Sequence, residues 1–225
     1  MSIKMDFLKE AKCIKREGAL DLLVWLEESG FFEAPASSRY HGNHEGGLAA
    51  HSMYVHDVMR ELLSILPIEG IDMESVHICG LLHDVCKVNF YELDQEEATS
   101  AQMRKFQELS DVALPKGTKT KAHLIKVIDA LLKKEPIPEF KPSYKIVDKL
   151  PMGHGEKSVY LLQKFFMLTD EEALAIRWHL AGFDAGTLFH YPSGFPFQKA
   201  VRSVKLVPML FLSDYKATYL KDRWE

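Results

Sequence analysis

Two segments of this chain place a histidine, and then an adjacent His-Asp pair, within apolar stretches. The first segment runs from Gly46 to Ser52 and carries His51; the second runs from Gly80 to Lys87 and carries His83 and Asp84. Adjacent polar side chains are unusual where a core favours apolar residues, and burying them without partners would cost several kcal/mol. The fold must therefore supply a partner, and a metal ion is an obvious one.

The size and composition fit a globular protein. Of the 225 residues, 47% are hydrophobic, which is enough for a packed core in one large domain or two small ones. We expect a single domain over residues 1–225, with an N-terminal helical extension at 1–40 and an insertion at 95–140. The formal net charge of -4 provides no basic field for broad nucleic-acid binding, although a local basic patch is compatible with it.

The cysteines and the N-terminal residues bear on the compartment. Cys13, Cys79 and Cys86 are odd in number and lack the CxxC spacing of zinc sites, which favours a reducing cytoplasm over a disulfide scaffold. The first residues lack the apolar core of a secretion signal, and no run of about 18 apolar residues could span a membrane. We therefore expect a soluble cytoplasmic protein with no membrane partner.

Most of the chain has the apolar spacing of helices. In one predicted helix, His51 shares a face with Val55 and Met59 and so points toward the interior. Thr169 and Glu172 form a predicted capping box at the start of another. The predicted helices span residues 5–29 (as one or two helices), 47–66, 72–86, a segment ending near 167, 170–179, and 197–219, in which Pro208 either kinks the helix or starts a separate one.

Two short segments are predicted to be strands. Phe90–Leu93 and Ser143–Val147 could pair as a small hairpin around the insertion, which holds two polar amphipathic helices at 96–110 and 119–134. Residues 182–196 are predicted to be a loop rich in glycine, proline and aromatic residues. The predicted fold class is therefore all-α: a helical bundle with a small β-hairpin and a helical insertion.

A later aspartate joins the first three candidate ligands. Asp214 lies in the apolar run from Val207, and with His51, His83 and Asp84 it offers the imidazole and carboxylate groups that divalent metals bind. Each residue alone has a plainer interpretation: a core histidine bonded to backbone, a helix C-terminus, or a satisfied core acid. Together they favour a metal site, because separate segments present metal-type residues from apolar faces.

Further charged and imidazole side chains lie near these segments. His154, between two glycines, and His179, near a helix end, are candidates for a second metal or for the substrate phosphate, the alternatives being a loop histidine and a favourable helix-terminal charge. Arg39, His41, Lys87 and Lys157 could bind an anionic substrate, the alternative being solvated surface charge. The remaining histidines are interpreted as structural or exposed: His44, His56, His77, His123 and His190.

The pattern H…HD…D, on His51, His83-Asp84 and Asp214, resembles the HD-domain superfamily of metal-dependent phosphohydrolases. The resemblance covers about Tyr40 to Tyr219. The chain also resembles uncharacterised bacterial HD hydrolases and the HD domain of a bacterial 3′-to-5′ exoribonuclease family. That family carries an additional N-terminal OB domain, for which the roughly 40 residues before this domain leave no room.

The resemblance implies a helical bundle with a cleft over one or two divalent ions (Mn, Fe, Mg, Ni or Zn) and phosphoester hydrolysis. His51, His83, Asp84 and Asp214 would hold the first ion. Asp84 would bridge to a second ion held by His154 and His179, and Lys87 and Arg39 would stabilise phosphoryl charge as catalytic groups. No GYP signature follows the motif, which argues against cyclic di-GMP as the substrate.

The expected partner is a small phosphoester or a nucleotide. An exonuclease or endonuclease acting on RNA or DNA is the second hypothesis, disfavoured by the low basic charge. A non-catalytic metal- or nucleotide-sensing module is the third, disfavoured by the complete ligand set. A di-iron oxygenase is a further variant, since some HD relatives oxidise their substrates. The sequence indicates no particular oligomeric state.

Overall fold

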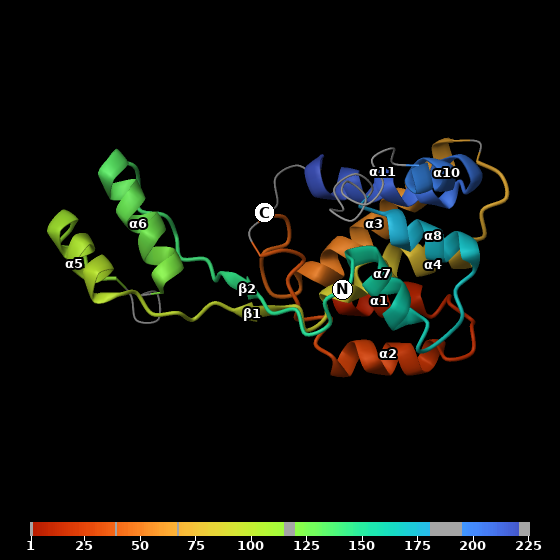
Figure 1. The fold of residues 1–225 in the computed structure, drawn as a ribbon, viewed down its shortest axis with the longest axis horizontal. Coiled ribbons are helices and arrows are strands. Elements are labelled where there is room, and N and C mark those ends of the chain that lie inside the picture. Colours follow the sequence, from red (N-terminus) through yellow and green to blue (C-terminus); the bar gives the residue numbers. More distant parts are fainter. Residues whose placement is uncertain (1, 39, 67, 115–119, 181–194, 221–225) are drawn as a thin grey trace. The chain divides into compact units, whose positions relative to one another are not determined.

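The computed structural model describes residues 2–38, 40–66, 68–114, 120–180 and 195–220. The chain forms two compact units, the first made of Met1–Phe90 and Asp148–Glu225, the second of Tyr91–Val147 (Figure 1). The described residues are mostly α-helical, with one two-stranded antiparallel sheet. The prediction of an all-α fold with a small hairpin is therefore confirmed.

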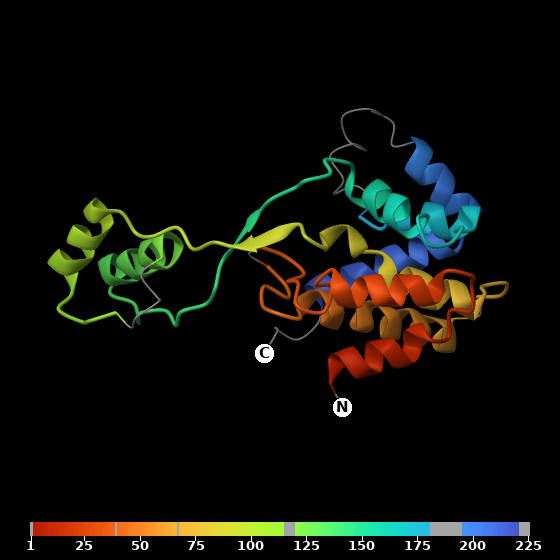
Figure 2. The ribbon, with the colours of Figure 1, turned by 90° about the horizontal axis from the view of Figure 1, so that it is seen from below.

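The first unit is a helical bundle. Helices α3 and α4 pack on each other, α11 packs on both α3 and α8, and α7 packs on α8 (Figure 2). Its elements are α1 (Ile3–Ala11), α2 (Ala19–Glu28), α3 (Gly47–Ile65), α4 (Met73–Leu82), the 3₁₀ turn η1 (Val85–Lys87), α7 (His154–Leu162), α8 (Asp170–Trp178), α10 (Phe195–Ser203) and α11 (Leu206–Tyr219). None of the helices in the described part of the chain has the length and apolar content to cross a membrane.

Helix α3 begins where two glycines permit a tight turn. Gly46 has a φ of 76°, a left-handed value that favours glycine, and a Cβ on Gly47 would lie 2.0 Å from the carbonyl oxygen of Gly42. The helix then buries the face predicted from its apolar spacing, and His51 in its second turn is buried with Val55. The glycine pair therefore fixes where His51 enters the core.

Helix α4 ends four residues earlier than the predicted 72–86. Its last residue is Leu82, His83 caps it, and Asp84 leaves helical geometry with φ -107° and ψ 16° before η1 begins. The chain turns here because the Lys87 amide bonds to the Asp84 carbonyl, which continues the chain as a 3₁₀ turn. The His-Asp pair therefore lies at a helix end, not inside a helix.

Two other predicted helix ends differ from the structure. Helix α7 ends at Leu162, five residues before the predicted end, because the Phe165 amide bonds to the Leu162 carbonyl in a tighter turn. The region predicted at 197–219 divides into α10 and α11. Pro208 is the third residue of α11, where a missing amide hydrogen breaks no intrahelical bond, so it belongs to the start of a separate helix. The capping box at Thr169 and Glu172 is present.

The second unit contains the predicted insertion. Strand β1 (Tyr91–Leu93) pairs antiparallel with β2 (Tyr144–Ile146), as predicted, with Tyr91 opposite Ile146. Helices α5 (Ser100–Leu109) and α6 (Lys121–Lys133) pack together around a small core of Phe106, Leu124 and Val127. The predicted loop at 182–196 lies largely outside the described residues.

Candidate metal centre

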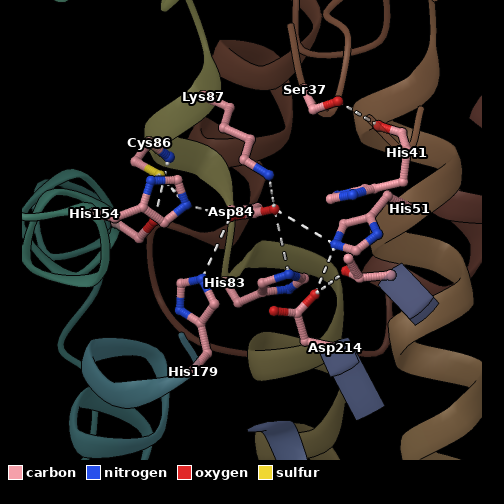
Figure 3. A network of polar contacts seen from close by, with 12 residues as sticks. Ser37, His41, His51, His83, Asp84, Cys86, Lys87, His154, His179 and Asp214 are labelled. Atoms are coloured by element: carbon pink, nitrogen blue, oxygen red, sulfur yellow. Dashed lines mark hydrogen bonds and ion pairs between the residues drawn. The ribbon is translucent and has the colours of Figure 1, made fainter. Parts of the chain in front are cut away.

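The carboxylate of Asp84 lies at the centre of a histidine cluster in the first unit (Figure 3). On one side, its Oδ1 atom lies 2.7 Å from Nε2 of His154, at the start of α7, and 3.5 Å from Nε2 of His179, at the end of α8. A Cβ on Gly155 would lie 2.2 Å from the Arg177 carbonyl oxygen, so this glycine permits the close α7–α8 contact. That contact places the two imidazoles 5.4 Å apart.

The other carboxylate oxygen of Asp84 faces a second pair of histidines. Its Oδ2 atom lies 3.6 Å from Nε2 of His51 on α3 and 3.5 Å from Nε2 of His83. It also accepts a hydrogen bond of 2.6 Å from the buried ammonium of Lys87. Asp214 on α11 completes this side, with its Oδ1 atom 3.0 Å from Nε2 of His51. Asp84 thus lies between two groups of ligand-type side chains, and each of its carboxylate oxygens faces one group.

Two of the imidazoles are held with one nitrogen facing the cluster. Nδ1 of His83 donates to the Gly80 carbonyl at 3.1 Å, and Nδ1 of His179 donates to the Ile176 carbonyl at 2.6 Å. Each carbonyl lies three residues earlier in the helix that its histidine terminates, so the helix end orients the ring. Whenever the ring is neutral, Nε2 is therefore its acceptor nitrogen, the atom that can bind a metal.

Those inward nitrogens fit a metal ion. Both Nε2 atoms are buried, and neither makes a hydrogen bond within the described parts of the chain. A buried polar atom without a partner is costly, and a cation would remove that cost. Ligand atoms that lie within 4.8 Å of one another form three overlapping groups: His51, His83 and Asp84; His83, His179 and Asp214; Asp84, His154 and His179. These buried groups could hold a metal ion.

The pKa values show how the site carries its charge. Burial opposes the ionised form of Asp84, but Lys87 and His83 hold its pKa well below the usual range. Burial acts likewise on Asp214, and His51 beside it lowers its pKa overall. Burial lowers the pKa of His83 to about 3, so this ring is neutral at pH 7. Burial opposes protonation of His179, but its contact with Asp84 raises its pKa overall. The two buried carboxylates thus stabilise positive charge beside them, which favours a cation.

A cavity of about 150 Å³ opens onto this cluster. Asp84, Lys87, His179 and Asp214 form its polar end. The lining is completed by His41, Leu180, Thr218 and three aromatic residues of α11, Phe211, Tyr215 and Tyr219. The cavity therefore joins a charged, metal-type centre to an aromatic wall.

The predicted substrate-binding residues have different positions. His41 lines the cavity, with its ring centroid 4.9 Å from that of His51, and burial lowers its pKa to about 4. Its loop is held by Ser37, whose hydroxyl donates to the His41 carbonyl at 2.8 Å. Lys157 is not part of the cavity lining; it pairs with Asp148 at 2.6 Å and lies over the Phe90 ring. Arg39 lies outside the described residues.

Sequence reasoning missed two features of the site. The Cys86 thiol lies 3.3 Å from Nε2 of His154, and burial raises its pKa to about 12, so it is a neutral packing group there. The aromatic wall was also missed, although Phe211, Tyr215 and Tyr219 recur every four residues on the helix that carries Asp214. That spacing was a usable signal, because residues four apart lie on one helix face.

Comparisons with protein-family models, curated proteins and solved structures find no match for this chain. The site is therefore interpreted from its own geometry.

Proposed function

We propose that this protein is a metal-dependent phosphohydrolase of the HD-domain superfamily that cleaves a small phosphoester or a nucleotide. One observation carries the proposal: the buried carboxylate of Asp84 has a pair of histidines at each of its two oxygens. This is the arrangement expected of a carboxylate that bridges two divalent ions. A packing role alone would not account for inward histidine nitrogens that lack hydrogen-bond partners.

The donor set favours a transition metal. His51, His83 and Asp214 would hold one ion with Asp84, and His154 and His179 would hold a second. Imidazole ligands suit Mn, Fe, Ni or Zn better than Mg, which prefers oxygen ligands. When bound, such an ion would polarise a phosphoryl oxygen and lower the pKa of water near neutrality.

Cationic and aromatic groups suit the proposed substrate. The Lys87 ammonium, at the polar end of the cavity, is positioned to offset charge that develops on a phosphoryl group. Tyr215 and Tyr219, whose ring centroids are 4.8 Å apart, offer flat faces on which a nucleobase could stack. A cavity of about 150 Å³ with an aromatic wall supports a small substrate over a polymer. The catalytic role of Arg39 stays a prediction.

The test compares two aspartates that form the same kind of ion pair. Asp84 and Asp148 each accept a 2.6 Å contact from a lysine ammonium, but only Asp84 has histidines at both oxygens. Asp84→Asn should lower metal content by at least one equivalent and kcat/KM by about 10³-fold or more, because the shared ligand and its charge are lost. Asp148→Asn should leave both within about threefold.

Metal content would be measured by mass spectrometry of purified protein, and turnover with phosphomonoesters, phosphodiesters and nucleotides in Mn²⁺, Mg²⁺ or Fe²⁺. Full metal content and activity in Asp84→Asn would refute the proposal. Degradation of RNA or DNA without turnover of small esters would replace it with a nuclease. Metal binding without turnover would indicate a sensing module, and oxygen consumption an oxygenase.

A further inference from the structure

A second histidine cluster lies where α1, α3 and α4 meet. Nε2 of His56 on α3 lies 3.0 Å from Nδ1 of His77 on α4, and the rings stack with centroids 4.9 Å apart. The Oε2 atom of Glu10 on α1 lies 4.0 Å from the first nitrogen and 3.8 Å from the second. None of these residues belongs to the Asp84 centre.

The three ligand atoms have the spacing of a three-ligand metal site. Their separations define a triangle, and the point equidistant from its corners lies about 2.1 Å from each, within the range of Zn–N and Zn–O bonds. His56 and His77 are buried, whereas Glu10 is partly exposed at the rim. An ion could therefore reach the cluster from the Glu10 side.

The backbone fixes this arrangement at the crossing of α3 and α4. A Cβ on Gly80 would lie 2.7 Å from the Cα atom of His56, so only a glycine permits this approach. Gly80 lies almost one turn after His77, and the close crossing therefore brings the two imidazoles together. The carboxylate of Asp57 lies 3.4 Å from Nδ1 of His56, on the side opposite the cluster. That nitrogen makes no hydrogen bond within the described residues, so Asp57 adds negative charge beside the ring and does not fix its orientation.

The local charges suit a cation. Arg60 lies 3.6 Å from Oε2 of Glu10, but its side chain is about half exposed and can turn toward solvent. The carboxylate is therefore available to an ion.

We infer that Glu10, His56 and His77 form a second metal site, independent of the Asp84 centre, that binds a Zn²⁺-type transition ion. Two imidazoles and one carboxylate are a recurrent zinc ligand set. Its ligands come from three helices, so the ion would tie α1 to the α3–α4 pair. We assign it a structural role, since the cavity with the aromatic wall lies at the other cluster.

The test counts zinc after dialysis against Zn²⁺, in the full chain and in its Asp84→Asn form. Glu10→Gln is the first variant, because it keeps the shape of a partly exposed side chain; His77→Ala is the second. His44→Ala, which removes an exposed histidine outside both clusters, is the matched control. Each test variant should bind one equivalent of zinc less than its parent in both backgrounds, whereas the control should bind the same amount.

A thermal-melting series provides the second readout. Zn²⁺ should raise the Tm of the Asp84→Asn protein, and Glu10→Gln should reduce that rise, whereas Mg²⁺ should have no effect. Unchanged zinc content in Glu10→Gln and in folded His77→Ala would overturn the inference, and so would an equal response to Mg²⁺. Because zinc is counted in the Asp84→Asn form too, the zinc content of the Glu10 cluster can be interpreted even if the phosphohydrolase proposal fails.

Discussion

Helix α3 supplies one histidine to each of two clusters, and so does helix α4 together with its capping residue His83. The clusters differ in what the imidazoles surround. At the Asp84 centre, inward nitrogens surround a buried carboxylate and lie 2.7–3.6 Å from its oxygens. At the Glu10 cluster, two imidazoles face each other at 3.0 Å, and the carboxylate lies at the rim. A central carboxylate can bind two ions at once, whereas a carboxylate at the rim can serve as the third ligand of a single ion.

The clusters also differ in access to a substrate. The Asp84 centre opens onto the cavity with the aromatic wall, and a buried lysine contacts its carboxylate. The Glu10 cluster joins three helices, and the nearby cation is a half-exposed arginine. Chemistry is therefore expected at the first cluster and structural support at the second. Residue type alone does not distinguish them, since both consist of histidines and carboxylates.

Removing one histidine from each cluster should separate the two roles. His83→Ala should lower kcat/KM at least about 100-fold, because it deletes a ligand whose Nε2 atom faces Asp84. It should retain the zinc of the Glu10 cluster. His77→Ala should do the reverse, losing that zinc while changing turnover far less. Phosphoester kinetics and metal analysis of both variants would check this, and equal losses in both would contradict the division of roles.

The sequence predicted the Asp84 centre far better than the Glu10 cluster. His83 and Asp84 are adjacent polar residues in an apolar run, so their burial alone signals a need for partners. His56 and His77 were interpreted as structural or exposed, although His56 is followed directly by Asp57 in a second His-Asp pair. Their contact depends on how α3 crosses α4, which local periodicity does not encode.

The same limit applies to parts of the fold. The hairpin was predicted well, since β-prone residues bounded by turn residues are a local signal. The end of α4 was predicted four residues late, because the turn comes from a backbone hydrogen bond between the Lys87 amide and the Asp84 carbonyl, which apolar spacing does not encode. Lys157 was predicted to bind substrate because it lies close to His154 in the sequence. The structure instead pairs it with Asp148, a contact that only the fold brings about.

Gly80→Ala should affect both clusters at once, with a smaller effect on each. The new Cβ would lie 2.7 Å from the Cα atom of His56, so α3 and α4 must move apart. We expect a loss of about 1–3 kcal/mol in the free energy of unfolding, the usual cost of overpacking a core. Zinc binding at the Glu10 cluster and turnover should both fall, because His77 lies on the displaced helix and His83 caps it.

Denaturant unfolding, zinc titration and kinetics would measure these losses. Met73→Ala, which shortens an exposed side chain on the same helix, is the control and should stay within about 0.5 kcal/mol of the parent. Wild-type stability in Gly80→Ala would show that the close crossing of α3 and α4 is not needed to position the two clusters.

A third kind of histidine, His123 in the second unit, should give the smallest effect. Its ring packs edge-to-face on Phe140 at 5.1 Å, and burial lowers its pKa below 6.5. Because the folded state disfavours its protonation, the stabilisation is present above pH 6.5 and is lost as the pH falls through the lowered pKa. An NMR titration should therefore give a pKa below 6.5 for His123, unchanged by Zn²⁺, whereas Zn²⁺ should shift the resonances of His56 and His77. A zinc-dependent pKa at His123 would show that burial alone is enough to make a histidine of this chain respond to metal.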